Sequence, residues 1–410
     1  MRTVVPMWDD WATGAAGAVE GLMNGLWVVS VLVHAYVALR LLPGVVAAAG
    51  APTAWLLAAL LAVSTALVPS ALRRRRGKRT PQEVLRSDLL AWASLTLMGL
   101  FSSLFVLTLV RDVVELVLWL VGLVGLYRVP ARDLDLSACA VVALALLATL
   151  LGLYNARKAP RVRTVDVPLK DLPPALHGFR IAQISDMHVG PTIKRPRMKY
   201  VVATINRLEA DVVAITGDLV DGNVSELTRH VAPLAGLRSR HGTFFVTGNH
   251  EYYSGVMPWM KYLPTLGVRV LLNEHVILLH HHVPIVLAGV TDFSAASYET
   301  SHRTDVALAI TGAPRAAVKI LLAHQPRSAG AAQAAGFDLQ LSGHTHGGQF
   351  VPWNFFVRFQ QPFTAGLHRV KNMLVYVSRG TGYWGPPKRL GAPAEITLLR
   401  LVNQTEPLRG

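Results

Sequence analysis

Histidine residues stand close together in two short segments of the C-terminal half of the chain. The segment "LSGHTHGGQF", residues 341–350, places His344 and His346 one residue apart between glycines. His324 follows the apolar residues of "AVKILLAHQP". Imidazole is a common metal ligand, but a histidine pair by itself is more often structural. A metal site is therefore a hypothesis that needs support from other residues.

Three earlier segments provide that support, because each is an apolar strand-like run that ends in metal-ligand residue types. They are "FRIAQISDMHVG" with Asp186 and His188, "ADVVAITGDLVDG" with Asp218 and Asp221, and "GTFFVTGNHEYYSG" with Asn249, His250 and Glu251. In an open α/β sheet the carboxyl ends of the strands meet at one edge. We therefore expect the side chains after all five predicted strands to converge.

The ligand types in this set limit which metal ions it could bind. Carboxylates, imidazoles and one amide oxygen, without a thiolate, suit Mn, Fe or Zn and do not form a cysteine-based zinc site. The supply of ligands is sufficient for two ions that share one bridging carboxylate. Such a pair polarises a phosphoryl oxygen and lowers the pKa of a water molecule, which favours hydrolysis of a phosphate ester.

With these residues identified, the chain resembles the calcineurin-like metallophosphoesterase family over about residues 180 to 400. The motifs are DxH at Asp186, GDxxD at Gly217, GNH at Gly248, a lone His324 and GHxH at Gly343. The extended forms "GHTHGGQ" and "SRGTGYWGPPKRLGAPAEITLL" are similar to those of membrane-associated or exported bacterial members. The resemblance implies an α/β domain, a four-layer α/β/β/α sandwich, with metals at the strand ends.

The resemblance also implies a role for each residue. The first metal would be bound by Asp186, His188, Asp218 and His346, and the second by Asp218, Asn249, His324 and His344, so that Asp218 bridges them. His250 would protonate the leaving oxygen of the substrate or stabilise its charge, and Asp221 would orient His250. The alternative for Asp221 is an Asx turn after the strand. Glu251 is expected only to cap the following turn, outside the site.

One position departs from the protein phosphatases of this family. Where they have an arginine after the GDxxD acid, this chain has Gly222, which argues against a phosphoprotein phosphatase. Arg379 and Arg389 in the C-terminal glycine-rich stretch could supply positive charge instead, but a solvated surface position is the favoured interpretation for both.

The N-terminal part is predicted to be an all-α, multi-span membrane domain. Four long runs carry no formal charge: Gly21–Leu39, Leu41–Leu72, Leu89–Val110 and Ser137–Tyr154. Each is close to the ~20 residues that a spanning helix needs. The segment Arg111–Tyr127 is ambiguous: its charges at Arg111, Asp112 and Glu115 favour a helix end or a turn at the membrane interface, and a fifth span is the alternative. The domain, residues 1–154, is therefore expected to have four or five helices. A juxtamembrane linker at 155–178 and the metallophosphoesterase domain at 179–402 are expected to follow.

The formal charge of +15 could suggest a nucleic-acid partner, but the basic residues have another interpretation. The densest basic run, Arg73–Arg79, lies between two predicted spans and is typical of a cytoplasmic loop. No motif for nucleic-acid binding accompanies it, so no such partner is expected. With four spans the catalytic domain would be cytoplasmic, which the basic residues after Tyr154 favour. With five spans it would be external, as in exported members of the resembling subgroup.

The sequence thus predicts an integral membrane phosphoesterase that hydrolyses a phosphate mono- or diester with two divalent metal ions. A lipid-linked substrate is suggested by the proximity of the membrane alone. The alternative enzyme is a membrane-anchored nucleotide phosphodiesterase. The alternative from another class is a membrane sensor or transporter with a regulatory metal domain, against which no predicted ligand position is missing.

Overall fold

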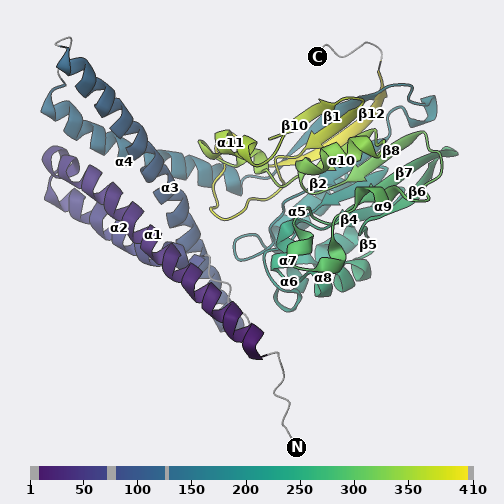
Figure 1. Cartoon of the computed structure of the whole chain (residues 1–410), viewed down its shortest axis with the longest axis horizontal. Coiled ribbons are helices and arrows are strands. Elements are labelled where there is room, and N and C mark those ends of the chain that lie inside the picture. The colour runs from purple at the N-terminus through teal and green to yellow at the C-terminus, as the bar shows by residue number, and fades with distance from the viewer. Residues whose placement is uncertain (1–8, 72–79, 125–128, 405–410) are drawn as a thin grey trace, which may run out of the picture. The chain divides into compact units, whose positions relative to one another are not determined.

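The computed structural model describes residues 9–71, 80–124 and 129–404 of the 410-residue chain (Figure 1). The chain divides into two compact units, a helical unit up to Leu150 and a second unit from Leu151 onward. The division falls inside one helix, Ala131–Arg157. The basic loop Arg73–Arg79 lies outside the described residues.

The first unit consists of long apolar helices. They are α1 (Asp9–Ala49), α2 (Ala51–Ala71), α3 (Pro81–Leu123) and α4 (Ala131–Arg157). By length and composition, three stretches of the described helices could cross a membrane: Gly25–Ala49, Ala51–Ser70 and Ala131–Arg157. This set is smaller than the four or five spans expected, and the charge-free run 89–110 lies within α3.

Within the ambiguous segment Arg111–Tyr127, the described residues 111–124 do not form a helix of their own, and residues 125–127 lie outside the description. α3 begins at a capping box in which Thr80 and Glu83 hydrogen-bond each other's backbone, and it continues unbroken to Leu123. A capping box satisfies amide groups that the first helical turn leaves without partners. Because α3 has no turn between 110 and 113, this segment adds no fifth helix.

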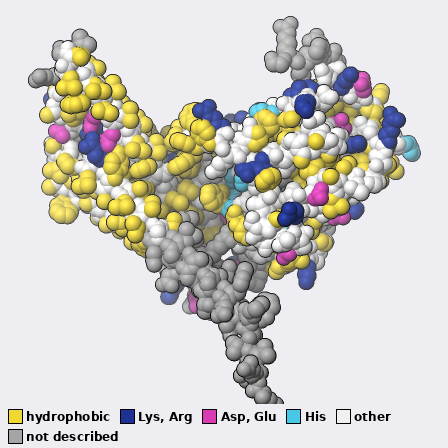
Figure 2. Space-filling model, viewed as in Figure 1, with side chains coloured by type: hydrophobic (Ala, Val, Ile, Leu, Met, Phe, Trp, Pro, Cys, Tyr) yellow, Lys and Arg dark blue, Asp and Glu magenta, His cyan; other side chains and the backbone are white. Residues whose placement is uncertain are grey.

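The charges of this segment are paired within the helical unit. Arg40 of α1 lies 3.0 Å from Asp112 and 2.9 Å from Glu115 of α3. Arg111 lies 2.6 Å from Glu115. Figure 2 shows charged side chains gathered within the hydrophobic surface of the helical unit. These residues therefore link α1 to the middle of α3, whereas a helix end or an interfacial turn was expected.

The second unit contains two six-stranded mixed sheets. The first has the order β1-β12-β2-β3-β4-β5 and the second β10-β11-β9-β8-β7-β6. The strands of the first sheet are β1 (Arg161–Leu169), β2 (Arg180–Ile184), β3 (Val212–Thr216), β4 (Thr243–Val246), β5 (Val268–Val270) and β12 (Glu395–Asn403). Those of the second are β6 (Glu274–His280), β7 (Val283–Gly289), β8 (Val318–Leu322), β9 (Leu339–Ser342), β10 (Gly366–Val370) and β11 (Met373–Val377).

Apolar side chains alternate between the two faces of the strands, so the sheets pack face to face and the helices cover their outer faces. In β3, Val212 and Ala214 belong to a core between the sheets, whereas Val213 and Ile215 pack in a separate core. Successive strand side chains point to opposite faces of a sheet, so each strand serves both cores. The helices are α5 (Arg195–Asn206), α6 (Val224–Val231), α7 (Asn249–Tyr253), α8 (Val256–Tyr262), α9 (Val306–Ile310), α10 (Ala329–Ala334) and α11 (Trp353–Phe356).

The outer cores complete the predicted four layers. Residues of α5, α6 and α8 pack on the outer face of the first sheet, and residues of α9 and α10 pack on the outer face of the second. The expected α/β/β/α sandwich is therefore confirmed.

The segment expected as a juxtamembrane linker contains an ordered strand. β1 pairs in parallel with β12 over nine residues, from Arg161 opposite Glu395 to Leu169 opposite Asn403. The prolines and basic residues of this segment suggested a linker, but an edge strand tolerates both. The second unit thus begins well before Phe179, the residue from which the catalytic domain was expected.

Candidate metal centre

The predicted site residues follow the carboxyl ends of β2, β3, β4, β8 and β9. In each case the first of them stands two or three residues after the strand: Asp186, Asp218, Asn249, His324 and His344. β2, β3 and β4 are parallel, as are β8 and β9. Their carboxyl ends therefore lie at common sheet edges, and the structure brings all nine predicted residues to one place.

Five of the seven predicted ligands have a left-handed backbone. The φ angles are 55° at Asp186, 50° at His188, 51° at Asp218, 71° at His344 and 52° at His346. Positive φ is uncommon for residues other than glycine and concentrates at functional sites. The sharp turns after each strand end aim the ligands inward at a cost in backbone strain.

Glycines of the motifs are required by close packing of these turns. A side chain on Gly343 would overlap Ser185 and the carboxylate of Asp186, and one on Gly248 would overlap the carboxylate of Asp218. These glycines therefore let one ligand turn pack against the carboxylate of another.

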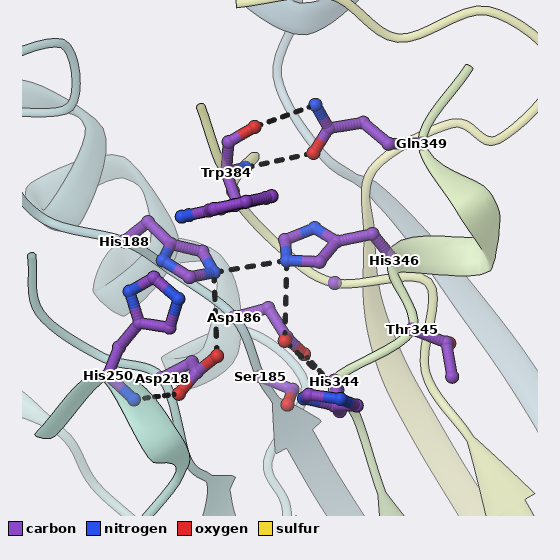
Figure 3. A network of polar contacts seen from close by, with 12 residues as sticks. Ser185, Asp186, His188, Asp218, His250, His344, Thr345, His346, Gln349 and Trp384 are labelled. Atoms are coloured by element: carbon purple, nitrogen blue, oxygen red, sulfur yellow. Dashed lines mark hydrogen bonds and ion pairs between the residues drawn. The ribbon is translucent and has the colours of Figure 1, made fainter. Parts of the chain in front are cut away.

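A first group of candidate ligands consists of Asp186, His188 and His346 (Figure 3). Nε2 of His346 lies 3.0 Å from Nε2 of His188 and 3.4 Å from Oδ1 of Asp186. Asp186 also accepts hydrogen bonds from the backbone N–H of His344, at 3.0 and 3.1 Å. This contact joins a turn of the first sheet to a turn of the second.

A second group consists of Asp218, His324 and His344. Nε2 of His324 lies 3.2 Å from Oδ2 of Asp218 and 3.2 Å from Nδ1 of His344. The buried Oδ1 of Asn249 has no hydrogen-bond partner among the residues that the structure describes. A buried polar oxygen without a partner is costly, and a metal ion would satisfy it. The residues present therefore fit the second ion that the resemblance implies.

Asp218 connects the two groups. Its Oδ2 faces His324 and also lies 3.8 Å from Nε2 of His188, whereas its Oδ1 accepts a hydrogen bond of 2.8 Å from the backbone N–H of His250. Burial alone would raise the pKa of Asp218, but the charges of His324 and His250 outweigh it and hold the pKa well below its usual value. The carboxylate is thus ionised, as a ligand must be.

Hydrogen bonds on the far side of two imidazoles fix their orientation. Nδ1 of His324 lies 2.7 Å from the carbonyl oxygen of Thr216, and Nδ1 of His188 lies 2.9 Å from Oδ1 of Asp221. Both partners are acceptors, so each Nδ1 donates its N–H outward and each Nε2 faces the centre, where it would present a lone pair to a metal ion in exchange for its own proton. This is the usual arrangement around metal-binding histidines.

A third group places His250 beside the first. Nδ1 of His250 lies 2.6 Å from Oδ1 of Asp221, the same oxygen that His188 contacts. The ring of Trp384 lies 5.8 Å from that of His250. Asp221 therefore orients two imidazoles, where an Asx turn was the alternative interpretation.

Comparisons with known proteins agree with this geometry. Residues 179–348 match the calcineurin-like phosphoesterase family. A bovine protein described as a transmembrane protein with metallophosphoesterase domain is 43% identical over 315 residues, which cover 74% of this chain and 70% of the bovine one. The chain belongs to the calcineurin-like phosphoesterase family. Members of the family generally bind two divalent metal ions.

Two further relatives extend the comparison. A zebrafish protein with the same description is 40% identical over 254 residues, covering 60% of this chain and 58% of its own. An uncharacterized metallophosphoesterase of Helicobacter pylori is 38% identical over 257 residues, covering 62% of this chain and 67% of its own. The descriptions of the vertebrate relatives and the apolar helices of this chain together indicate a membrane-associated phosphoesterase.

Glu251 has a larger structural role than the expected turn cap. It is fully buried and accepts hydrogen bonds from the backbone N–H groups of Asp218, Leu219, Val220 and Gly248, at 2.7 to 3.3 Å. Burial, and next the charge of Asp218, raise the pKa of its carboxyl to about 8. Glu251 thus holds the GDxxD and GNH turns of this phosphoesterase together. Its place directly after the GNH motif was the available signal.

Arg389 is not on the solvated surface as expected. It is 1% exposed, and its Nη2 donates hydrogen bonds to the carbonyl oxygens of Gly382 and Arg379, at 2.6 and 2.8 Å. The same nitrogen lies 3.2 Å from Nδ1 of His346. Burial, the charge of His188 and this guanidinium lower the pKa of His346, so its imidazole stays neutral. Arg379 is only partly exposed and lies 3.3 Å from Glu395.

Proposed function

We propose that this protein is an integral, multi-pass membrane phosphoesterase that hydrolyses a phosphate mono- or diester with two divalent metal ions. Mn, Fe and Zn suit its nitrogen and oxygen ligands. The observation that carries the proposal is the position of Asp218, whose Oδ2 faces Nε2 of His324 at 3.2 Å and Nε2 of His188 at 3.8 Å. One carboxylate oxygen thereby serves both groups of ligands.

The ligands divide between the ions as the family motifs imply. The first ion would be held by Asp186, His188, Asp218 and His346, and the second by Asp218, Asn249, His324 and His344. When bound, such ions supply positive charge to the phosphoryl oxygens and make a water molecule acidic enough to attack near neutral pH. The unpartnered oxygen of Asn249 supports the second ion in particular.

His250 acts on the leaving group. Asp221 accepts a hydrogen bond from the Nδ1–H group of His250, which leaves Nε2 of His250 to face the substrate. An imidazolium in this place can donate a proton from Nε2 to the departing oxygen, or stabilise its charge. The ionised Asp221 keeps the ring in the orientation that this transfer needs.

We propose a cytoplasmic location for the catalytic unit, which the distribution of basic residues supports. The run Arg73–Arg79 and the residues Arg157, Lys158, Arg161 and Arg163 are both positive-inside signals. They lie on the same side only if α3 and α4 both cross the membrane. We therefore infer four crossings, with the N-terminus and the catalytic unit inside.

The substrate class can be tested with the detergent-solubilised full chain. Phospholipid, isoprenoid phosphate, nucleotide and aryl phosphate esters are compared in the presence of Mn, Fe or Zn. Proximity of the membrane favours the lipid-linked esters over the nucleotides. Metal-stimulated hydrolysis that is lost in Asp218→Asn but kept in Asp166→Asn, a change at an exposed ion pair with Arg400, is the expected result. Metal binding without hydrolysis of any ester would overturn the proposal and favour a sensor or transporter.

A further inference from the structure

A run of exposed aromatic residues follows the GHTHGGQ motif. We define residues Val351–Phe359 as the aromatic segment, which comprises α11 and a short 3-10 helix at Val357–Phe359. Within it Phe355, Phe356 and Phe359 are 56%, 53% and 75% exposed, and Val351 and Trp353 are also exposed. Soluble surfaces seldom expose such contiguous apolar groups, and those that do mark a protein or membrane interaction site.

The charged residues that flank the aromatic segment in the sequence are all basic. From Leu339 to Ala394 the chain has six Lys and Arg residues and no Asp or Glu. Arg358 lies 5.4 Å above the ring of Phe359, and Arg369 and Lys371 are exposed. In Figure 2 hydrophobic side chains gather where Figure 1 places α11, with Lys or Arg side chains beside them. Aromatic and basic residues together are typical of segments that bind the interface of a membrane with anionic lipids.

The aromatic segment is joined to the metal centre through the GHTHGGQ turn. A side chain on Gly348 would overlap the backbone of Asn354, so the turn and α11 pack directly against each other. Gln349, between them, accepts a hydrogen bond from the backbone N–H of Trp384 and donates one to its carbonyl oxygen, both at 2.9 Å. Figure 3 shows Trp384 next to His188 and His346. The aromatic segment therefore packs directly against the turn that carries the ligands His344 and His346.

We propose that the aromatic segment inserts into the headgroup region of a membrane that carries anionic lipids. A bilayer is the occupant because the same chain contains apolar helices long enough to span one and because residues 339–394, which include the segment, contain no Asp or Glu. If the proposed function holds, insertion presents the metal centre to phosphoesters in lipid headgroups. The enzyme then acts on substrates that remain in the membrane.

Insertion can be measured without enzyme activity. The full chain in a Cys139→Ser background receives Phe356→Cys, is labelled with a polarity-sensitive fluorophore and is reconstituted in vesicles of phosphatidylcholine and phosphatidylglycerol. A matched control carries Leu279→Cys on β6, which is 64% exposed and apolar but outside the segment. Quenching by a lipid nitroxide near the acyl carbonyl is expected at Phe356→Cys and not at Leu279→Cys.

Other fluorescence results overturn the proposal. Equal quenching at both positions, or none at either, shows that the aromatic segment has no special contact with lipid. A blue shift at Phe356→Cys that the lipid nitroxide does not quench shows that a protein surface, such as a second copy, covers the segment.

Activity then tests the consequence for substrate choice. Rates are compared for a phospholipid in vesicles and for a soluble aryl phosphate diester. In Phe355→Ser/Phe356→Ser the ratio of these rates should fall roughly tenfold or more, since each phenyl ring loses burial worth more than a factor of ten. In Ile277→Ser/Leu279→Ser, on exposed positions of β6, the ratio should stay unchanged. An unchanged ratio in the first variant overturns the role in substrate presentation, whereas absence of hydrolysis of every ester tested, in the unmodified protein, refutes the proposed function and leaves the quenching result valid.

Discussion

Nδ1 of His250 lies 2.6 Å from Oδ1 of Asp221. The same carboxylate oxygen lies 2.9 Å from Nδ1 of His188. One acidic side chain therefore orients both a candidate metal ligand and the candidate proton donor. The two imidazole rings are nearly perpendicular, with centroids 4.6 Å apart, so a change at Asp221 is expected to disturb both functions at once.

Asp221→Asn should weaken metal binding at the first site and lower turnover together. The amide cannot accept both N–H groups with the strength of a carboxylate, and loss of such outer partners typically costs 10- to 100-fold in metal affinity or activity, roughly. Metal titration and turnover at saturating metal measure the two effects separately. An unchanged metal affinity would show that His188 does not depend on Asp221.

His250→Ala should retain both metal ions but lose roughly 10²- to 10⁴-fold in turnover, the usual scale for a proton-transfer group. The loss should be smaller for aryl esters than for alkyl esters, because a good leaving group needs little protonation. His282→Ala, in an exposed turn, is the matched control. Equal losses for both kinds of ester would exclude the acid role and leave charge stabilisation.

Asp218→Ala should empty both metal positions, whereas Asn249→Ala should release only the second ion. Asp218 faces both groups of ligands, but Asn249 contributes one oxygen that has no other partner in the described structure. Elemental analysis of the purified variants gives the metal content per chain, with Asp166→Ala as control. Two ions retained by Asp218→Ala would overturn the bridging assignment.

The residues that the structure brings together could be recognised in the sequence because their signal is local. Each ligand follows an apolar strand by two or three residues, so the motifs and the strand ends could be recognised together. The contributions of Glu251 and Arg389 are different, since their main partners are backbone groups. Glu251 accepts N–H groups more than 30 residues away, and Arg389 donates to carbonyl groups that no side-chain pattern reveals.

Element boundaries were harder to predict from the sequence than the strand-end motifs. The charges at Arg111 and Asp112 suggested the end of a helix, but partners on another helix let α3 continue through them. The strand β1 has exposed and basic residues along most of its length, so only its pairing with β12 distinguishes it from a linker. In both cases a partner distant in the sequence decides the local structure.

Glu251→Gln should destabilise the catalytic unit even though the side chains are nearly equal in size. Above pH 8, where the carboxyl is ionised, it accepts four backbone N–H groups, whereas a glutamine amide would direct its own N–H groups at some of these donors, so unfolding is compared at that pH. Leaving one buried donor unsatisfied costs about 1–3 kcal/mol. Denaturant unfolding of the full chain, with the exposed Glu209→Gln as control, should show a lower midpoint for Glu251→Gln alone. Equal midpoints would mean that the two turns are held by other contacts.

The side of the membrane that carries the catalytic unit follows from the number of crossings. Because α3 is continuous from Pro81 to Leu123, residues 113–123 add no separate helix, and the proposed count is four.

A cysteine at Lys170, exposed after β1, should then resist an impermeant thiol reagent in intact cells when Cys139 is replaced. It should react after permeabilisation. Ala51→Cys, at the exposed first residue of α2, lies outside in the same arrangement and should react in intact cells, which controls for reagent access. Labelling of Lys170→Cys in intact cells would show that the number of crossings is odd. The three helices that qualify by length and composition would then be the spans, α3 would not cross, and the metal centre would act on phosphoesters outside the cytoplasm.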